Sequence, residues 1–331
     1  MPFSPTLARR RALAAALAAV TLAAAPSLAG AQANPQTPAR VLVGFPAGGS
    51  FDAIARLLAD KLKDELKRPV MVDNRPGAGG RLAVEVLKGA PRDGSTVMLA
   101  PEALVVHYPH TYSKLSYDPV KDLAPIGVVS DFPFGLAVGT EPPAKTLAEY
   151  VAWARQNPTK TNFGTPALGA PQHFFGIVLG KAIGAPMQEI AFQGSAPSLV
   201  ALMGGQISAS SDVLPSLLEQ HKGGKIRILA VSSPSRMPQV PDVPTFAESG
   251  YPDIVGMGFN ALYAPAGTPP EAITRWNEAL NRVLANAEVK AKLESWGFRA
   301  VPGTPAALAE RGQAEAKRWE PIIKSIGFRA D

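Results

Sequence analysis

The sequence predicts an α/β protein of two lobes, each built on a mixed, mostly parallel sheet flanked by helices. Short apolar runs alternate with amphipathic helical patterns along most of the 331 residues. This alternation is typical of parallel strands joined by crossover helices. The length suffices for about two domains. Proline-rich connectors at residues 139–145 and 237–246 punctuate the chain, and no short repeat occurs in it.

The first residues have the pattern of a signal peptide. Arg9–Arg11 form a basic start, residues 12–25 are an alanine-rich apolar run, and Ala31–Ala33 fit a small-x-small cleavage site. We therefore expect residues 1–33 to be removed and the protein to be exported to the periplasm. An uncleaved anchor is the alternative, which the short and weakly apolar run disfavours. The arginines leave both the Sec and the twin-arginine route open.

Composition excludes several classes of protein. The net charge of +6 becomes 6 − 3 = +3 without the three N-terminal arginines, and no stripe of Lys and Arg interleaved with aromatic residues suggests a nucleic-acid partner. The lack of cysteine excludes a thiol nucleophile, a cysteine-based zinc site and a redox centre. No later run is apolar enough to span a membrane, and no motif indicates a cofactor.

Strands and helices follow one another in a regular order. Apolar residues recur at spacings of three and four from Ile54 to Leu62, which predicts a helix after the first strand. Short apolar runs bounded by turn residues predict the strands. The predicted strands are residues 40–45, 69–74, 96–100, 134–139 and 226–231, and the predicted helices of the second half are residues 147–156 and 274–296.

The two lobes are expected to share the chain unequally. The chain is predicted to cross from one lobe to the other near Asp131–Phe134 and to return near Val255–Asn260. Lobe 1 would then consist of residues 34–133 and 257–331, and lobe 2 of residues 134–256.

A glycine-rich turn follows the first predicted strand, in the stretch GFPAGGSFD from Gly44 to Asp52. Such a turn exposes backbone N–H groups, and the helix after it adds its unpaired amides and the positive end of its dipole. Ser50 is a suitable N-cap, and Asp52 suits the first turn. The stretch therefore indicates an anion site, although the two side chains could serve only to cap the helix.

The second predicted strand is followed by a turn of the same design. The stretch DNRPGAGGR contains Gly77, Gly79 and Gly80, which allow positive φ and close backbone approach. A dinucleotide-binding fingerprint would need a further glycine where Leu82 stands. Two such turns at one sheet edge form a crevice of the kind in which open α/β sheets bind ligands, unless they merely connect elements.

The predicted second lobe offers two more helix starts. Residues 162–176 place Thr165, and residues 191–207 place Ser195, before a helix that begins near a proline. The two lobes could thus direct helix N-termini at one another across a cleft. That arrangement suits a carboxylate bound by backbone amides without an arginine.

Catalytic motifs are lacking, and the isolated polar residues are ambiguous. His107 and His110 are three residues apart without an acidic partner for a metal site. His173 at a helix start could be a structural hydrogen-bonding residue. Asp212 could reach the cleft or cap a turn, and Glu102, just after a strand, could face a ligand or be an exposed loop acid.

Several motifs in the same order resemble those of one family. They are FPAGGSFD, DNRPGAGG, YDPVKDLAPIGVV, GSAPSLVALMGGQI, VPDVPTFAESG and LYAPAGTPPEAI. From about Arg40 to about Gly327 the chain resembles the Bug (TctC) family, the periplasmic solute receptors of tripartite tricarboxylate transporters. The resemblance implies a type II-like periplasmic binding protein fold whose two lobes close on a small carboxylate.

The resemblance also implies a set of ligand-binding residues. In this family the two glycine-rich turns grip a carboxyl group, and further contacts come from the second lobe. Glu102 stands where a small hydroxyl residue is common. The implied positions are Ala47, Gly48, Gly49, Ser50, Asp52, Gly77, Ala78, Gly79, Glu102, Thr165, Pro166, His173, Gly194, Ser195 and Asp212.

Departures from the family pattern bear on the ligand. The third loop has fewer serines than is usual, and Val213 replaces a common asparagine. A polar tricarboxylate is therefore less well supported than a monocarboxylate or a less polar dicarboxylate, with an aromatic or nitrogen-bearing portion near Glu102. The expected walls of the site are Phe132, Phe134, Phe259 and His107.

These observations lead us to expect a monomeric receptor that is not an enzyme. Its partners would be a small organic acid and the membrane subunits of a tripartite tricarboxylate transporter. Two alternatives remain open: a ligand-sensing co-receptor for a sensor kinase, and a periplasmic hydrolase or isomerase that uses Asp52, Asp212 or His173.

Overall fold

A computed structural model describes residues 37–330. The expected signal peptide lies outside the described residues. Ten strands and the helices around them confirm the predicted α/β class. No helix within residues 37–330 combines the length and the apolar character needed to cross a bilayer.

The first sheet region is built from the beginning and the end of the chain. β1 pairs in parallel with both β2 and β3, and β3 pairs antiparallel with β9. β4 lies antiparallel against β9, and β10 against β4. The strands are β1 (Ala39–Val43), β2 (Val70–Asn74), β3 (Thr96–Pro101), β4 (Leu123–Val138), β9 (Met257–Pro265) and β10 (Arg299–Ala300).

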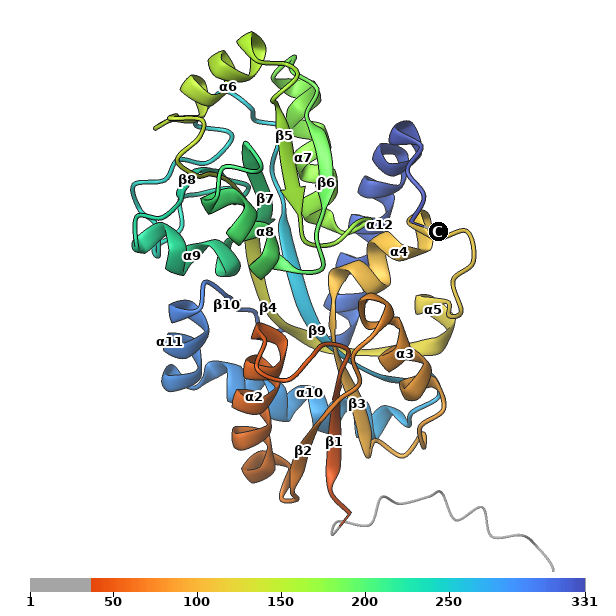
Figure 1. The fold of residues 1–331 in the computed structure, drawn as a ribbon. Coiled ribbons are helices and arrows are strands. Elements are labelled where there is room, and N and C mark those ends of the chain that lie inside the picture. Colours follow the sequence, from red (N-terminus) through yellow and green to blue (C-terminus); the bar gives the residue numbers. More distant parts are fainter. Residues whose placement is uncertain (1–36, 331) are drawn as a thin grey trace, which may run out of the picture. The chain divides into compact units, whose positions relative to one another are not determined.

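The second sheet region is built from the middle of the chain. β5 pairs in parallel with β6 and β7, and residues 134–138 of β4 pair antiparallel with β7 and β8. β4 therefore belongs to both regions (Figure 1). The strands are β5 (Asn162–Thr165), β6 (Gln188–Ala191), β7 (Ala209–Val213) and β8 (Arg227–Val231).

The two long strands β4 and β9 differ from the sequence prediction. The predicted strand at residues 134–139 covers only the end of β4, and β9 was not predicted. Pro125, Gly127 and Pro133 interrupt the alternating pattern of β4, and its register against β9 shifts at two places. Every antiparallel pair among the described strands is made by β4 or β9, so these two strands make the sheet mixed.

α2 and α10 pack together beside the first sheet region. α2 (Ser50–Leu66) buries Ile54, Leu58 and Leu62, as their spacing predicts. α10 (Pro270–Ala285) buries one apolar stripe that includes Trp276.

The single helix predicted for residues 274–296 is two helices. The side chain of Asn286 accepts hydrogen bonds from the N–H groups of Glu288 at 2.9 Å and Val289 at 3.3 Å. An asparagine in this role caps a new helix, so α10 ends at Ala285 and α11 (Ala287–Ser295) begins after it.

The C-terminal helix α12 (Pro305–Ile326) packs against β4, η2 and α4. Figure 1 shows it running past α4 toward the second sheet region. The remaining helices are η1 (Ala78–Gly80), α3 (Arg81–Lys88), η2 (Ala103–His107), α4 (Tyr108–Thr111), α5 (Pro119–Asp122), α6 (Leu147–Gln156), α7 (Pro171–Ala182), α8 (Ser195–Met203) and α9 (Leu214–Lys222).

One hydrophobic core extends through both sheet regions. At the place where β4 passes from one region to the other, the rings of Phe134 and Phe175 stack with centroids 4.8 Å apart. A smaller core lies between α8, α9 and β8, and includes Leu202, Leu217 and Ile228. The two regions are therefore joined by packing as well as by the chain.

Candidate functional site

The turn after β1 lies directly against the turn after β2. A Cβ atom on Gly44 would lie only 2.6 Å from the Cα of Gly80. The side-chain amide of Asn74, at the end of β2, donates a hydrogen bond of 3.1 Å to the carbonyl of Phe45. Both turns thus follow the carboxyl ends of neighbouring parallel strands, where open α/β sheets place their ligand sites.

The first turn leaves backbone N–H groups free at the start of α2. Gly49 precedes the helix without a side-chain cap, so Ser50 is not the N-cap that the sequence suggested. The Oδ2 atom of Asp52 accepts hydrogen bonds from the N–H of Gly48 at 2.9 Å and from Arg56 at 2.8 Å. The other N–H groups of the first helical turn have no partner inside the helix. They can therefore bind an anion.

Asp52 stabilises this turn as a charged group. Hydrogen bonds from Arg56 and Gly48 lower its pKa to about 2. A carboxyl group whose pKa is lower in the folded state contributes stability above its unfolded pKa, and this stability is lost as the pH falls through the folded pKa. We expect Asp52→Asn to lower the free energy of unfolding by about 1–2 kcal/mol at pH 7.

The cost of Asp52→Asn should shrink as the pH falls from 7 toward 3, because the unfolded parent chain then takes up a proton on Asp52 that the folded protein, with its lower pKa, does not yet bind. Urea unfolding at several pH values measures it. Asp60→Asn is the matched control on the same helix, since Asp60 is exposed and pairs with Lys63. A cost of Asp52→Asn that is small and independent of pH would contradict the assignment.

The second turn has an unusual backbone. Gly77, Gly79 and Gly80 have positive φ, and Ala78 has a φ of 48°, which is rare for a residue with a Cβ. A Cβ on Gly79 would lie 2.6 Å from the hydroxyl of Tyr108. The packing of Tyr108 thus fixes the turn, and glycine is required at this position.

The third and fourth loops hold each other at the carboxyl end of β5. The N–H of Phe192 donates to the carbonyl of Thr165 at 2.9 Å, and the N–H of Gly194 donates to the carbonyl of Pro166 at 3.1 Å. Thr165 is fully buried, and its Oγ1 has no hydrogen-bond partner among the described residues. These contacts place Gly194, with a φ of 107°, immediately before α8, which begins at Ser195.

Asp212 lies behind the start of α8. Its Oδ1 accepts a hydrogen bond of 2.7 Å from the N–H of Val213, whereas Oδ2 has no hydrogen bond within residues 37–330. Burial raises the pKa of Asp212 to about 7, and the Ser195 hydroxyl and the Val213 N–H act in the opposite direction. Near neutral pH the carboxyl group is therefore partly protonated and can donate a hydrogen bond as well as accept one.

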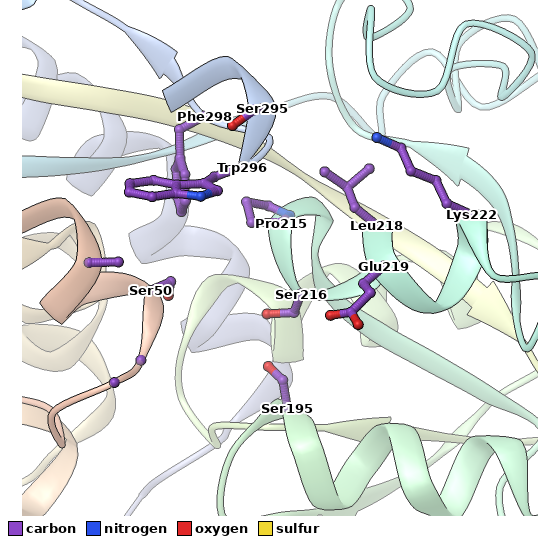
Figure 2. A pocket seen from close by; sticks show the side chains of 13 residues that line it. Ser50, Ser195, Pro215, Ser216, Leu218, Glu219, Lys222, Ser295, Trp296 and Phe298 are labelled. Carbon is purple, nitrogen blue, oxygen red and sulfur yellow. The ribbon is translucent and has the colours of Figure 1, made fainter. Parts of the chain in front are cut away.

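A cavity of about 740 Å³ joins the first turn to the starts of α8 and α9. Figure 2 shows Ser50 and Trp296 on one side of it and Ser195, Ser216 and Glu219 on the other. Among the predicted residues, Gly48, Gly49, Ser50 and Ser195 line it. The predicted residues outside its lining are Ala47, Asp52, Gly77, Ala78, Gly79, Glu102, Thr165, Pro166, His173, Gly194 and Asp212.

Sequence reasoning missed Trp296, Ser216 and Glu219. Trp296 follows α11, where Gly297 has a φ of 85°, and a Cβ on Gly297 would lie 2.7 Å from Leu218 of α9. The Trp-Gly pair at the end of a helical pattern was the available signal for this turn. The distant start of α9 was not visible from sequence spacing.

Glu102 does not face the cavity. It is buried between η2 and α12, and its Oε1 lies 3.8 Å from the Nδ1 of His107. Desolvation raises the pKa of Glu102 to about 8; the nearby Glu315 adds to this, while Arg311 and Arg318 oppose it. The strand β3 ends one residue earlier, and η2 turns the side chain into the core. The structure therefore places Glu102 in the core and outside the lining of the cavity.

His173 is engaged within the protein. Its Nδ1 accepts a hydrogen bond of 3.2 Å from the N–H of Gly169, and its Nε2 lies 2.6 Å from the carboxylate of Glu189. Because Nδ1 accepts, the proton resides on Nε2 and is donated to Glu189. No ring nitrogen remains for a ligand, which favours the structural role that the sequence left open.

The four expected wall residues belong to the core. Phe132 and Phe134 pack edge to face with ring centroids 5.8 Å apart. Phe259 lies under the guanidinium of Arg311 at 4.7 Å. His107 is fully buried, and desolvation lowers its pKa to about 3, so the imidazole is neutral. None of the four lines the cavity.

Within residues 37–330, no three His, Asp or Glu side chains gather closely enough to hold a metal ion. The groups that line the cavity include the N–H groups at the start of α2, the hydroxyls of Ser50, Ser195 and Ser216, the aromatic ring of Trp296, and the charged side chains of Glu219 and Lys222. This set can bind and orient a small anion.

Sequence comparison identifies relatives along nearly the whole chain. Residues 54–328 match the tripartite tricarboxylate transporter family receptor, TctC. The UPF0065 protein in the gbd 5′ region of Cupriavidus necator is 34% identical, with 96% of each chain covered. Protein BugT of Bordetella pertussis is 32% identical over 90% of this chain and 92% of BugT.

Solved structures of similar proteins include two with a named acid. R. palustris Rpa4515 with adipate is 30% identical, has a TM-score of 0.83 and covers 88% of this chain and 98% of its own. MatC from Rhodopseudomonas palustris with bound malate is 28% identical, with a TM-score of 0.78 and coverages of 86% and 98%. The periplasmic binding protein BugD is 28% identical, with a TM-score of 0.79 and coverages of 88% and 98%.

These likenesses agree with the motif pattern and the fold, and they make the protein a binding receptor. The chain belongs to the TctC family of tripartite tricarboxylate transporter receptors, whose relatives include the Bug proteins.

Proposed function

We propose that this receptor captures a small organic acid whose carboxylate binds at the first turn of α2. The observation that carries the proposal is that Gly48, Gly49 and Ser50 share one cavity with Ser195 at the start of α8. N–H groups and the dipole of α2 attract a negative group without the desolvation cost of a fixed cation. The adipate and malate of the two similar structures are acids of this class.

Ligand capture would proceed by closure of two lobes. The proposed lobes are residues 34–133 with 257–331, and residues 134–256; β4 supplies its first part to one sheet region and its last five residues to the other. The bidentate contact of Arg299 with Asp131, at 3.0 and 2.7 Å, lies next to this crossing. A ligand that contacts both α2 and α8 stabilises the closed form by its differential affinity.

One substitution can remove a single N–H from the proposed carboxylate site. Ser50 is the first residue of α2, a position at which proline is well tolerated. Gly49 before it has an extended backbone (φ −81°, ψ 173°), which is the conformation that a residue before proline prefers. We expect Ser50→Pro to weaken the binding of a small carboxylate about tenfold, the value of one hydrogen bond to a charged group. The measurement is isothermal titration of the exported protein with succinate, glutarate, adipate and the matched diols.

Ser50→Ala is the control, because it removes the hydroxyl and keeps the N–H. Thermal unfolding with and without ligand checks that both variants fold, since a ligand at about 100 times its dissociation constant adds about 2.7 kcal/mol to the stability. Binding of the acids but not the diols, with a larger loss for Ser50→Pro than for Ser50→Ala, supports the proposal. Equal binding by all three proteins would refute it.

We further propose that residues 1–33 direct export to the periplasm and that the loaded monomer delivers its acid to the membrane subunits of a tripartite tricarboxylate transporter. The family and the similar periplasmic proteins support this role. Deletion of the gene should abolish uptake of the acid. Loss of gene induction with intact uptake would instead indicate a co-receptor for a sensor kinase.

A further inference from the structure

The cavity wall that faces α2 is rich in oxygen acceptors. Ser195 begins α8, and Ser216 and Glu219 lie on α9. Figure 2 shows the carboxylate of Glu219 on the same side as the hydroxyls of Ser195 and Ser216. Behind Ser195, the fully buried Asp212 has an oxygen, Oδ2, with no hydrogen bond in the described part of the chain. We call Ser195, Ser216 and Glu219 the acceptor wall.

Glu219 of the acceptor wall makes no ion pair within residues 37–330. Lys222 follows Glu219 by three residues on α9, a spacing at which helical ion pairs form. No ion pair joins them, and in Figure 2 the two side chains extend in different directions. Among the cavity-lining residues of the described chain, Lys222 is the one cation. Glu219, an exposed side chain, thus carries a negative charge without an ion pair at the cavity wall.

The rest of the cavity has a different character. The start of α2 supplies N–H groups and a positive potential. Apolar surfaces of Trp296, Pro215 and Leu218 also line the cavity; in Figure 2, Trp296 and Pro215 lie beside the space between this start and the acceptor wall, and Leu218 lies near Glu219 and Lys222. The Nζ of Lys292 lies over the ring of Trp296, 5.2 Å from its centroid. The cavity therefore offers an anion site at α2, apolar surface along its side, and acceptors for a hydrogen-bond donor on the opposite wall.

We propose that the acceptor wall binds a protonated amine at the far end of the ligand, so that the preferred ligand class is a small acid with a terminal ammonium group. The inference rests on the proposed carboxylate site at α2. An ammonium group has three donors and no acceptor, which matches two hydroxyls and a carboxylate. A second carboxylate at this place would face Glu219, and such like-charge contacts give specificity by repulsion.

Matched pairs of acids test the inference. Isothermal titration would compare succinate with 4-aminobutanoate, glutarate with 5-aminopentanoate and adipate with 6-aminohexanoate, using the parent protein, Glu219→Gln and Lys222→Gln. We expect at least one amino acid to bind the parent about fivefold or more tightly than its dicarboxylate, which is the upper range for a partly exposed charge pair. Glu219→Gln should abolish this preference, and Lys222→Gln should leave it or increase it.

The outcomes separate this inference from the proposed function. Butanoate, pentanoate and hexanoate carry the carboxylate alone, so their binding reports on the site at α2. If they bind but the parent prefers the dicarboxylates, or if Glu219→Gln keeps the preference for the amino acids, the acceptor wall does not bind an amine. If no acid of any kind binds, the carboxylate site itself fails and the inference fails with it.

Discussion

Trp319→Ala is expected to lower the free energy of unfolding by about 3–5 kcal/mol, the range for removal of a fully buried large aromatic side chain. Trp319 lies on α12 and is 3% exposed. Its ring centroid lies 5.1 Å from that of His107 and 5.2 Å from that of Phe175, and Phe174 packs beside it. The truncation would leave a cavity that the surrounding rings cannot fill.

The effect should be large because Trp319 joins both parts of the sheet. His107 belongs to η2, beside the first sheet region, whereas Phe174 and Phe175 belong to α7, beside the second. Earlier on α12, Arg318 donates to the carbonyl of Val255, and Arg311 donates to the carbonyl of Met257 at 3.2 Å. α12 thus holds the chain where it returns from the second region.

Urea unfolding of the parent and Trp319→Ala measures the loss. Trp296→Ala is a matched control, because this second tryptophan is partly exposed at the cavity and its removal leaves no buried void. We expect the control to lose about 1 kcal/mol or less, as most substitutions away from the core do. Equal losses for the two variants would show that α12 does not stabilise the core in this way.

Glu102→Gln is expected to change how stability depends on pH. The pKa of Glu102 is about 8 in the folded protein and 4.5 in the unfolded chain. Between these values the folded protein keeps a proton that the unfolded chain has lost, so the stability of the parent falls as the pH rises. At 1.36 kcal/mol per pKa unit, the fall between pH 5 and pH 8 is up to about 4 kcal/mol. Glutamine has no such titration.

We compare the free energy of unfolding of Glu102→Gln with that of the parent at each pH. As the pH rises from 5 to 8, this difference should shift in favour of Glu102→Gln by about 2–4 kcal/mol. The other charged and titratable groups around Glu102 are the same in both proteins, so their own contributions to the pH dependence of stability cancel in the comparison. They are His107, Tyr263, Arg311, Glu315 and Arg318.

Urea unfolding at pH 5, 6.5 and 8 provides the comparison for Glu102→Gln. Glu310→Gln, an exposed change on α12, is the control and should follow the parent at every pH. A difference between Glu102→Gln and the parent that stays constant from pH 5 to pH 8 would show that Glu102 is ionised in the fold. In that case His107, 3.8 Å away, would be its positively charged partner.

Local patterns in the sequence predicted most of the regular elements. The helix at residues 147–156 has the bounds of α6, and Ile54, Leu58 and Leu62 are buried as their spacing indicates. The two glycine-rich turns were predicted from strand, turn and helix signals that lie within about ten residues of one another. Helices and turns of this kind depend on residues that are close together in the sequence, so they can be predicted without knowledge of the tertiary structure.

Residues far apart in the sequence decided the rest. Glu102 is placed by α12, some two hundred residues later, and the turn at Gly297, next to Trp296, lies against Leu218 of α9. The pattern around Glu102 is that of a residue after a strand, which fits a ligand site and a buried core position equally well.

By itself, the sequence determined the fold class, the family and the turn that begins α2, because periodicity and backbone conformation are encoded locally. Only the tertiary structure decided which polar groups face the cavity. Burial and charge compensation depend on what packs against a side chain, and for Glu102, His173 and Glu219 those neighbours come from other elements.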